Sequence, residues 1–263
     1  MIKKIINSLN YRLLKRFYNI KTFLRNLYRI KKLDYKKPLF LNCDNLRENL
    51  TRAQSCSKEP ETIKWLEKYK NKKKIVMWDI GANVGSYSLI GASLGFEVFA
   101  FEPAFQNYFK LHENISLNKA DKKIRAFCIS FGQKTLLGDF NVFDLSYGTS
   151  RGNYNSQNYY ELKLDLIAKK KTVVFEIDKF IELFKLKDPD LIKIDVDGGE
   201  FEILLGAIKL LKNSTSLKSI LLEFDENHNS FLNLEKFLRK YGWVVSEKYP
   251  RQPSVWNLIL KKN

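Results

Sequence analysis

The chain has 263 residues, of which 44% are hydrophobic and 14% are aromatic, so it can bury a full core and is not a globally disordered protein. Its 46 lysines and arginines outnumber 29 acidic residues, which gives a formal charge of +17. Three cysteines and two histidines are too few and too scattered for a disulfide scaffold or a zinc cluster, so we expect no metal site and a reducing compartment.

The positive charge is concentrated at the N-terminus. Residues 1–37 hold 12 basic side chains and one acid, a net charge of +11, which leaves +6 for the rest of the chain. Apolar residues recur every three or four positions over residues 2–30, which predicts one amphipathic helix with a basic opposite side. Such a helix can lie on an anionic membrane surface, or its apolar face can pack on its own domain or on a second subunit. RNA is the remaining, less favoured partner.

The N-terminal region lacks the features of an export signal. Charged side chains interrupt its apolar residues every few positions, so we predict no secretory signal and a cytoplasmic protein. No run of about 18 uncharged apolar residues occurs, so we expect no transmembrane helix.

The segment after the predicted N-terminal helix is expected to be a linker. Residues 31–60 are polar and irregular, with Pro38 and Pro60 as breaks, and predict a linker with short helical pieces followed by a helix. We divide the chain into a basic helical appendage at 1–37, a linker and leading helix at 38–74, and a main domain at 75–263.

From Ile75 onward, predicted strands alternate with predicted helices. The apolar run Ile75–Ile80 is typical of a strand buried on both faces. The alternation predicts an α/β fold with a mainly parallel, doubly wound sheet that binds ligands at the carboxyl ends of its strands, and the last two strands can pair antiparallel at an edge. Further strands are expected at 98–101, 124–129, 140–145, 173–177, 191–196, 219–224, 243–247 and 255–260, and helices near 84–94, 105–118, 200–211 and 230–240.

A glycine-containing turn follows the first of these strands. Asp79, Gly81, Asn83 and Gly85 form the spacing D-x-G-x-N-x-G, which differs from the dinucleotide fingerprint G-x-G-x-x-G. Glycine lets the backbone turn sharply and approach a ligand, and the helix that begins here offers unpaired N–H groups. The leading acid would repel a pyrophosphate but suits a cationic amino-acid group.

The next strand ends in an acid, Glu102. A carboxylate at this position can accept both hydroxyl groups of a ribose, as the acid after the second strand does in nucleoside-binding sheets. Asp79, the two glycines and Glu102 together describe a site for an adenosyl group that bears an amino acid.

A third acidic stretch lies at another strand-to-helix turn. Asp195 can orient the amino group of a donor or act as a base. Asp197 and Glu200 can hold a helix N-terminus, polarise an acceptor hydroxyl or bind a cation. His228 is the only histidine near the expected cleft edge and is a candidate base, with an exposed loop position as the alternative. The polar insertion 146–160, rich in tyrosine, can hold a polar acceptor or form a mobile loop without acceptor contact.

The stretches DIGANVGSYS, FAFEP, LIKIDVDGGEFEILLGA and ILLEFDE, in this order, resemble the FkbM family of S-adenosylmethionine-dependent methyltransferases over about residues 60–247. The resemblance implies a class I methyltransferase, Rossmann-like fold whose sheet has seven strands, the last one antiparallel. The cofactor-binding residues that it implies are Asp79, Gly81, Asn83, Gly85, Glu102 and Asp195. Asp195 and Glu200 stand in the family's K-I-D-x-E-G-x-E stretch, and Asp197 replaces its more common, longer Glu.

The resemblance also implies O-methylation of hydroxyl groups, frequently on sugars. We therefore predict an O-methyltransferase that transfers a methyl group from S-adenosylmethionine to a sugar hydroxyl of a cell-surface glycan or lipid-linked saccharide, at the inner face of the membrane. Natural-product O-methylation is the alternative. RNA methylation is less favoured, because Asp195–Gly198 lacks the (Asp/Asn)-Pro-Pro-(aromatic) turn and no Pro-Cys pair occurs; we expect no specific nucleic-acid partner.

Overall fold

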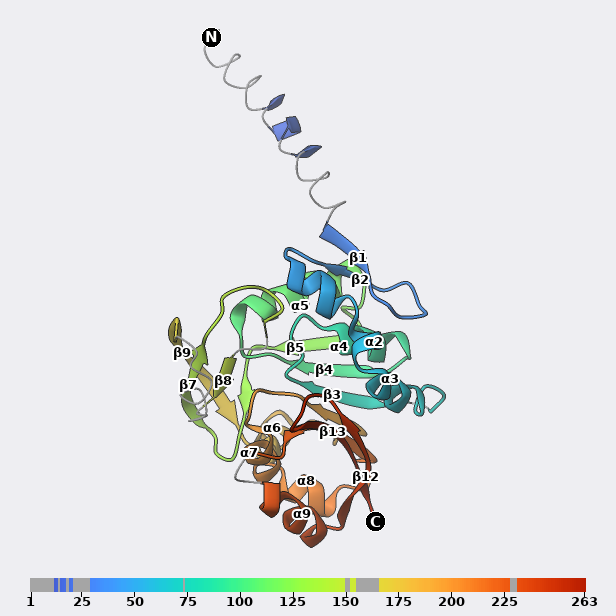
Figure 1. Ribbon diagram of the computed structural model, residues 1–263, viewed down its shortest axis with the longest axis vertical. Helices are drawn as coiled ribbons and strands as arrows, with labels where there is room; N and C mark the ends of the chain where they lie inside the picture. The colour runs from blue at the N-terminus through green and yellow to red at the C-terminus, as the bar shows by residue number, and fades with distance from the viewer. Residues whose placement is uncertain are drawn as a thin grey trace.

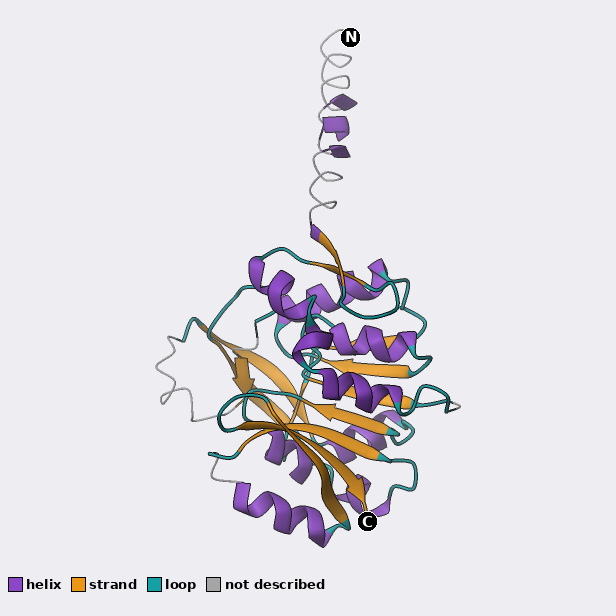
Figure 2. Cartoon of the chain, turned by 45° about the vertical axis from the view of Figure 1, so that its right-hand side comes forward, coloured by secondary structure: helices purple, strands orange, loops and turns teal. Residues whose placement is uncertain are grey.

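A computed structural model describes residues 12–13, 15–17, 19–20, 29–72, 74–149, 152–154, 166–227 and 231–263. Its centre is a seven-stranded sheet in the order β12-β13-β11-β10-β3-β4-β5, shown in Figures 1 and 2. β13 runs opposite to the other six strands, and it lies between β11 and β12 rather than at the edge. The strands are β3 (Val76–Ile80), β4 (Glu97–Phe101), β5 (Ile124–Phe127), β10 (Leu191–Ile194), β11 (Ser219–Asp225), β12 (Trp243–Pro250) and β13 (Val255–Lys262).

Helices cover both faces of this sheet, which explains why its central strands are mostly apolar. One hydrophobic cluster joins the sheet to α3 (Pro60–Glu67), α4 (Ser86–Ser93) and α5 (Phe105–Leu117). A second cluster joins the opposite face to α6 (Ile177–Phe184), α7 (Glu200–Leu205), α8 (Ile208–Asn213) and α9 (Phe231–Lys240). The predicted doubly wound architecture is therefore confirmed.

Strand alternation assigns residues of β3 to the two faces. Trp78 and Ile80 belong to the cluster beneath α6–α9, whereas Met77 belongs to the cluster beneath α3–α5. Asp79 faces the same side as Met77, because side chains two positions apart share a face. The acid at the end of β3 is thereby directed toward α4.

Two predicted strands do not join the main sheet. The segments expected at 140–145 and 173–177 are β7 (Leu136–Val142) and β9 (Ala168–Phe175) of a second sheet in the order β6-β9-β7-β8, completed by β6 (Ser130–Phe131) and β8 (Gly152–Tyr154). Both strands begin earlier than predicted. Most of their first residues are exposed, and Gly138 and Asp139 in β7 and the three lysines in β9 break any apolar run there.

The helix predicted at 200–211 is also wrong in one respect, since it is divided into α7 and α8. The break lies at Gly206, where a side chain would overlap the carbonyl group of Gly132. The backbones of Gly206 and Gly132 are therefore in close contact where α7 ends.

The predicted irregular linker is mostly packed structure. A hairpin of β1 (Ile30–Lys32) and β2 (Phe40–Asn42) precedes a π-helix, η1 (Glu48–Arg52), and a short helix, α2 (Ser55–Lys58). Leu33 and Leu41 lie in the main core. Asn114 of α5 and Asn118, directly after it, accept hydrogen bonds of 2.7 and 2.8 Å from the backbone of β2. The hairpin is thus fixed to α5 by side chains that a local sequence pattern does not pair with it.

Before residue 29, the N-terminal appendage is described only at residues 12–13, 15–17 and 19–20, which are helical and lie away from the domain in both views (Figures 1 and 2). Leu13, Phe17 and Ile20 are exposed there. The rest of the helix predicted over 2–30 lies outside the described residues, apart from its last two positions. Among the residues described, no helix has the length and apolar content needed to span a membrane.

Candidate active site

Four adjacent strands bring acidic side chains to one edge of the sheet. Asp79 lies in β3, Glu102 follows β4, Asp195 follows β10, and Glu223 lies near the end of β11. These strands are neighbours in the sheet and run parallel, so their carboxyl ends meet at the same edge. The structure thus brings the predicted acids Asp79, Glu102 and Asp195 together.

The two glycines after β3 permit close packing around this edge. Gly81 and Gly85 have φ values of +83° and +92°, in the left-handed region that favours glycine. A side chain at Gly81 would overlap the backbone carbonyl of Asp195, and a Cβ at Gly85 would lie 2.5 Å from Cδ1 of Leu111. The turn after β3 therefore packs directly on the end of β10 and on α5.

Asn83 connects the glycine turn to two other parts of the site. Its backbone N–H donates a 2.8 Å hydrogen bond to Glu102, and its side-chain amide donates one of 2.8 Å to the carbonyl of Thr149. Asn107 of α5 donates a second 2.8 Å hydrogen bond to the same carbonyl. The start of the polar insertion is therefore held against the turn, although the predicted acceptor region also includes residues outside those described.

Glu102 is buried and keeps hydrogen-bonding capacity for a ligand. Its Oε1 accepts a 2.8 Å hydrogen bond from the backbone of Ala104, and its Oε2 accepts the one from Asn83. Burial raises the pKa of Glu102 to about 7, against the opposing effect of these two N–H groups. Each carboxylate oxygen can accept more than one hydrogen bond, so ribose hydroxyl groups can still bind.

Asp79 presents one unsatisfied oxygen. The hydroxyl of Ser88 donates a 2.5 Å hydrogen bond to Oδ2, whereas Oδ1 is buried and has no partner within the described part of the chain. Burial raises the pKa of Asp79, and the nearby charge of Lys193 opposes this shift. A buried acceptor without a partner is costly, so this oxygen fits the ammonium group of an amino-acid ligand.

Lys193 and Asp195 form an ion pair at the end of β10. Lys193 is only 1% exposed, and its Nζ lies 2.6 Å from Oδ2 of Asp195. Burial alone would raise the pKa of Asp195, but the Lys193 charge and hydrogen bond hold it below its usual value. Asp195 is therefore ionised at neutral pH.

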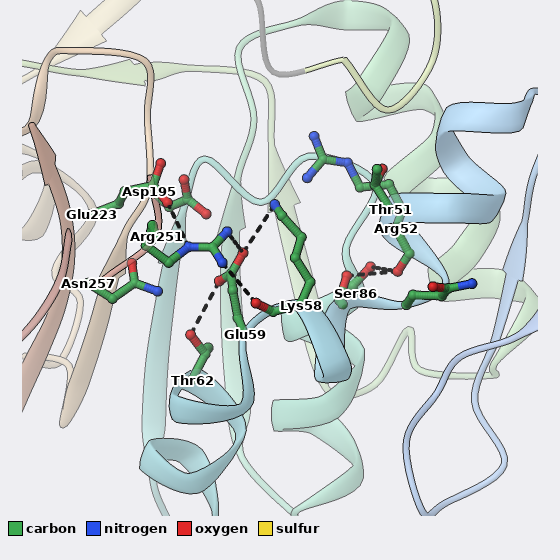
Figure 3. A network of polar contacts seen from close by, with 12 residues as sticks. Thr51, Arg52, Lys58, Glu59, Thr62, Ser86, Asp195, Glu223, Arg251 and Asn257 are labelled. Atoms are coloured by element: carbon green, nitrogen blue, oxygen red, sulfur yellow. Dashed lines mark hydrogen bonds and ion pairs between the residues drawn. The ribbon is translucent and has the colours of Figure 1, made fainter. Parts of the chain in front are cut away.

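Arg251 joins two further acids at this edge, as Figure 3 shows. Its terminal nitrogen lies 2.8 Å from Oε1 of Glu59, and its Nε lies 3.4 Å from Oε2 of Glu223. Burial, together with the charges of Asp195 and Glu59, raises the pKa of Glu223 to about 7, and Arg251 opposes the shift. Sequence reasoning missed Glu59 and Arg251. Glu59 belongs to residues 38–74, called the leading segment below, and no local motif links this segment to the loop between β12 and β13.

Glu200 and His228 are the other predicted catalytic residues. Glu200 begins α7, and its Oε1 accepts a 3.2 Å hydrogen bond from the backbone of Gly198. Burial raises the pKa of Glu200 well above its ordinary value, against the opposing backbone hydrogen bonds at the start of α7. His228 lies outside the described residues, and its role stays a prediction. Asp197 is exposed at the same turn.

The sheet order and the position of these groups define a class I, Rossmann-like methyltransferase. A model of the methyltransferase FkbM domain matches residues 79–245, and the chain belongs to this family. S-adenosylmethionine is accordingly the cofactor, which supplies an electrophilic methyl group when bound. The unsatisfied oxygen of Asp79 and the carboxylate of Glu102 fit its ammonium and ribose groups.

Two similar proteins illustrate the relationship. The chain is 27% identical over 138 residues to the hexuronic acid methyltransferase AglP of Haloferax volcanii, a match that covers 52% of each chain. The crystal structure of methyltransferase FkbM from Methylobacillus flagellatus has a TM-score of 0.50 and 18% identity, and the match covers 72% of this chain and 44% of that one. The chain thus spans about half the length of each, and the solved structure supports the fold alone.

Proposed function

We propose that this chain transfers a methyl group from S-adenosylmethionine to a hydroxyl group of a sugar, within a cell-surface glycan or a lipid-linked saccharide. The cofactor half of this proposal is supported by Asp79 and Glu102 at adjacent strand ends. The sugar half is supported by the similarity to AglP, whose name assigns it a hexuronic acid as its acceptor.

The acceptor hydroxyl has to lose its proton during the reaction. Its oxygen forms a bond to the methyl carbon while the carbon–sulfur bond breaks and the electron pair stays on sulfur. We assign the proton to Glu223, which is half-buried near the end of β11 and is anchored by Arg251 through its Oε2. A carboxylate with a pKa of about 7 suits proton transfer at neutral pH.

The remaining predicted residues take other parts in this proposal. Asp195 is ionised and tied to Lys193, which suits a group that orients the donor's ammonium rather than one that accepts a proton. Glu200 accepts a hydrogen bond from the backbone of Gly198 and so holds the start of α7. His228 stays a second candidate for the base.

The direct test compares glycans from cells with and without the gene by mass spectrometry. We expect one sugar residue to lack a CH₂ unit when the gene is deleted, and purified protein with S-adenosylmethionine to restore that unit to the isolated glycan. Unchanged glycans, together with a methylated small molecule that disappears on deletion, would favour the natural-product alternative.

We further propose that residues 1–37 hold the enzyme at the cytoplasmic face of a membrane. The segment carries a net charge of +11, and Phe17, between Leu13 and Ile20 on the helix, is 69% exposed. Exposed apolar residues beside lysines and arginines suit a lipid surface that bears negative charge. An acceptor linked to lipid would lie on the same surface.

A further inference from the structure

Arg52 lies beside the glycine turn but comes from the leading segment. It is the last residue of η1, and its carbonyl oxygen accepts hydrogen bonds from the hydroxyl groups of Ser55, at 2.7 Å, and Ser86, at 3.0 Å. Because Ser86 begins α4 directly after Gly85, these contacts fix the backbone of Arg52 next to the proposed cofactor site.

The guanidinium group of Arg52 is only partly used by the protein. Its Nε donates a 2.8 Å hydrogen bond to the carbonyl of Gly148, whereas its two terminal nitrogens have no hydrogen-bond partner in the described part of the chain. In Figure 3 the side chain extends to the same side of the site as the amine of Lys58. The group is half-buried, so its free N–H groups are accessible to a ligand.

The charge of Arg52 acts on both sides of the site. It lowers the pKa of Glu102, beyond β4, and that of Asp195, beyond β10, against the larger effect of burial on each. Since β3 lies between these two strands, Arg52 is close to the region that a ligand joining Glu102 to Asp195 would cross.

The cofactor carries one charged group that the acids cannot bind. Its carboxylate is attached to the same carbon as its ammonium group and needs a cation or N–H donors. Among the described residues, the other cations near these acids are engaged. Lys193 pairs with Asp195 at 2.6 Å, and Arg251 and Lys58 pair with Glu59 at 2.8 and 3.3 Å. Lys170, whose charge also acts on Glu102, donates a hydrogen bond to the carbonyl of Pro103. The guanidinium of Arg52 offers two parallel N–H groups, the arrangement that matches a carboxylate.

We propose that Arg52 binds the carboxylate of S-adenosylmethionine, an inference that rests on the cofactor site described above. The leading segment would then complete the cofactor site, with Asp79 and Asp195 on the ammonium and Glu102 on the ribose. Residues 48–52 would thereby be part of the binding site rather than a connection to it.

The test uses two ligands that differ only in the carboxylate, S-adenosylmethionine and its decarboxylated form. Calorimetry measures the affinity of the full chain and of Arg52→Gln for each. We expect the wild type to prefer the carboxylated ligand by about tenfold or more, the value of a charge-assisted hydrogen bond. Arg52→Gln should lose that preference and bind the decarboxylated ligand as the wild type does.

The controls separate this inference from the proposed function. Arg47→Gln removes a charge from the adjoining turn, where Arg47 pairs with Asp144 at 2.9 Å, and should leave both affinities unchanged. Glu102→Gln should lower the affinity for both ligands equally, because Glu102 is assigned to the ribose, which both ligands carry. If the wild type binds neither ligand, the cofactor site itself is wrong.

Several results would overturn the role of Arg52 alone. One is equal affinity of the wild type for the two ligands. The others are an equal loss of affinity for both ligands in Arg52→Gln, and an unchanged preference of that variant for the carboxylated ligand. If Arg52→Gln does not fold, Arg52→Lys keeps the charge without the paired N–H groups and should show a reduced preference. An unchanged preference in Arg52→Lys would then contradict paired binding.

Discussion

The backbone N–H of Asn83 donates a 2.8 Å hydrogen bond to Oε2 of Glu102, so the turn after β3 and the acid after β4 are held as one unit. Asn83 has a φ value of +53°, a left-handed conformation that asparagine tolerates better than most residues. The acid is thus positioned by the same turn whose glycines pack against Asp195 and α5.

Replacing Glu102 should weaken cofactor binding. Glu102→Ala removes the proposed acceptor for the ribose hydroxyl groups, and we expect the affinity for S-adenosylmethionine, measured by calorimetry, to fall at least about tenfold. Glu97→Ala is the matched control, because Glu97 begins the same strand but pairs with Arg125 at its opposite end. Unchanged affinity in Glu102→Ala would contradict the ribose assignment.

Replacing Gly81 should destabilise the fold more than its backbone conformation alone explains. Gly81→Ala introduces both left-handed strain and an overlap with the carbonyl of Asp195, whereas Gly95→Ala introduces only the strain, since nothing lies within 4 Å of its added Cβ. We expect about 1 kcal/mol of lost unfolding free energy for Gly95→Ala and more than about 2 kcal/mol for Gly81→Ala in urea titrations. Equal losses would show that the close approach to Asp195 is unimportant.

The stability of the fold should fall as the pH rises from about 4.5 to about 7. Burial raises the pKa of Glu102 from 4.5 to about 7, so the folded state binds a proton more tightly than the unfolded state does in that interval. At about 1.4 kcal/mol for each pKa unit, Glu102 accounts for a loss of about 3 kcal/mol. The loss is complete above the folded-state pKa.

Glu102→Gln provides the check on this pH dependence. The variant cannot titrate at position 102, so its unfolding free energy should change less between pH 5 and pH 7.5 than that of the wild type. Urea titrations at the two pH values measure this difference. An identical slope in both proteins would mean that Glu102 ionises normally in the folded state.

Replacing Glu223 should lower the rate of methyl transfer without changing the affinity for the cofactor. We expect Glu223→Gln to lower methyl transfer to the isolated glycan by about a hundredfold, a typical contribution of a general base, while calorimetry shows unchanged cofactor affinity. The wild-type rate should rise with pH through about 7, because the base acts when it is deprotonated. A retained rate in the variant would leave His228 as the base.

The N-terminal appendage should bind anionic vesicles through its apolar side chains. Leu13→Glu combined with Phe17→Glu in the full chain should abolish pelleting with vesicles that contain phosphatidylserine at low salt. Leu137→Glu is the control, since Leu137 is 72% exposed but lies on β7. Added salt should weaken wild-type binding by screening. Equal pelleting of the double variant would refute the membrane proposal.

Local patterns predicted the parts of this protein that depend on short stretches of chain. The apolar runs of β3, β10 and β11 identified strands with helices on both sides, and Gly81 and Gly85 identified the tight turn after β3. The boundaries of β7 and β9 were less well predicted. Gly138 and Asp139 interrupt the first half of β7, and three lysines follow Ala168 in β9, so neither strand begins with a continuous apolar signal.

The amino-acid sequence by itself determined the fold class and the positions of Asp79, Glu102 and Asp195, because parallel strands necessarily bring their carboxyl ends to one edge. Only the tertiary structure decided which cations meet those acids. Arg52 and Arg251 are about two hundred positions apart in the chain, and each reaches the site through long-range packing of the leading segment and the β12–β13 loop. A period of two or of 3.6 residues describes neighbours on one element, and contacts between distant elements leave no such period.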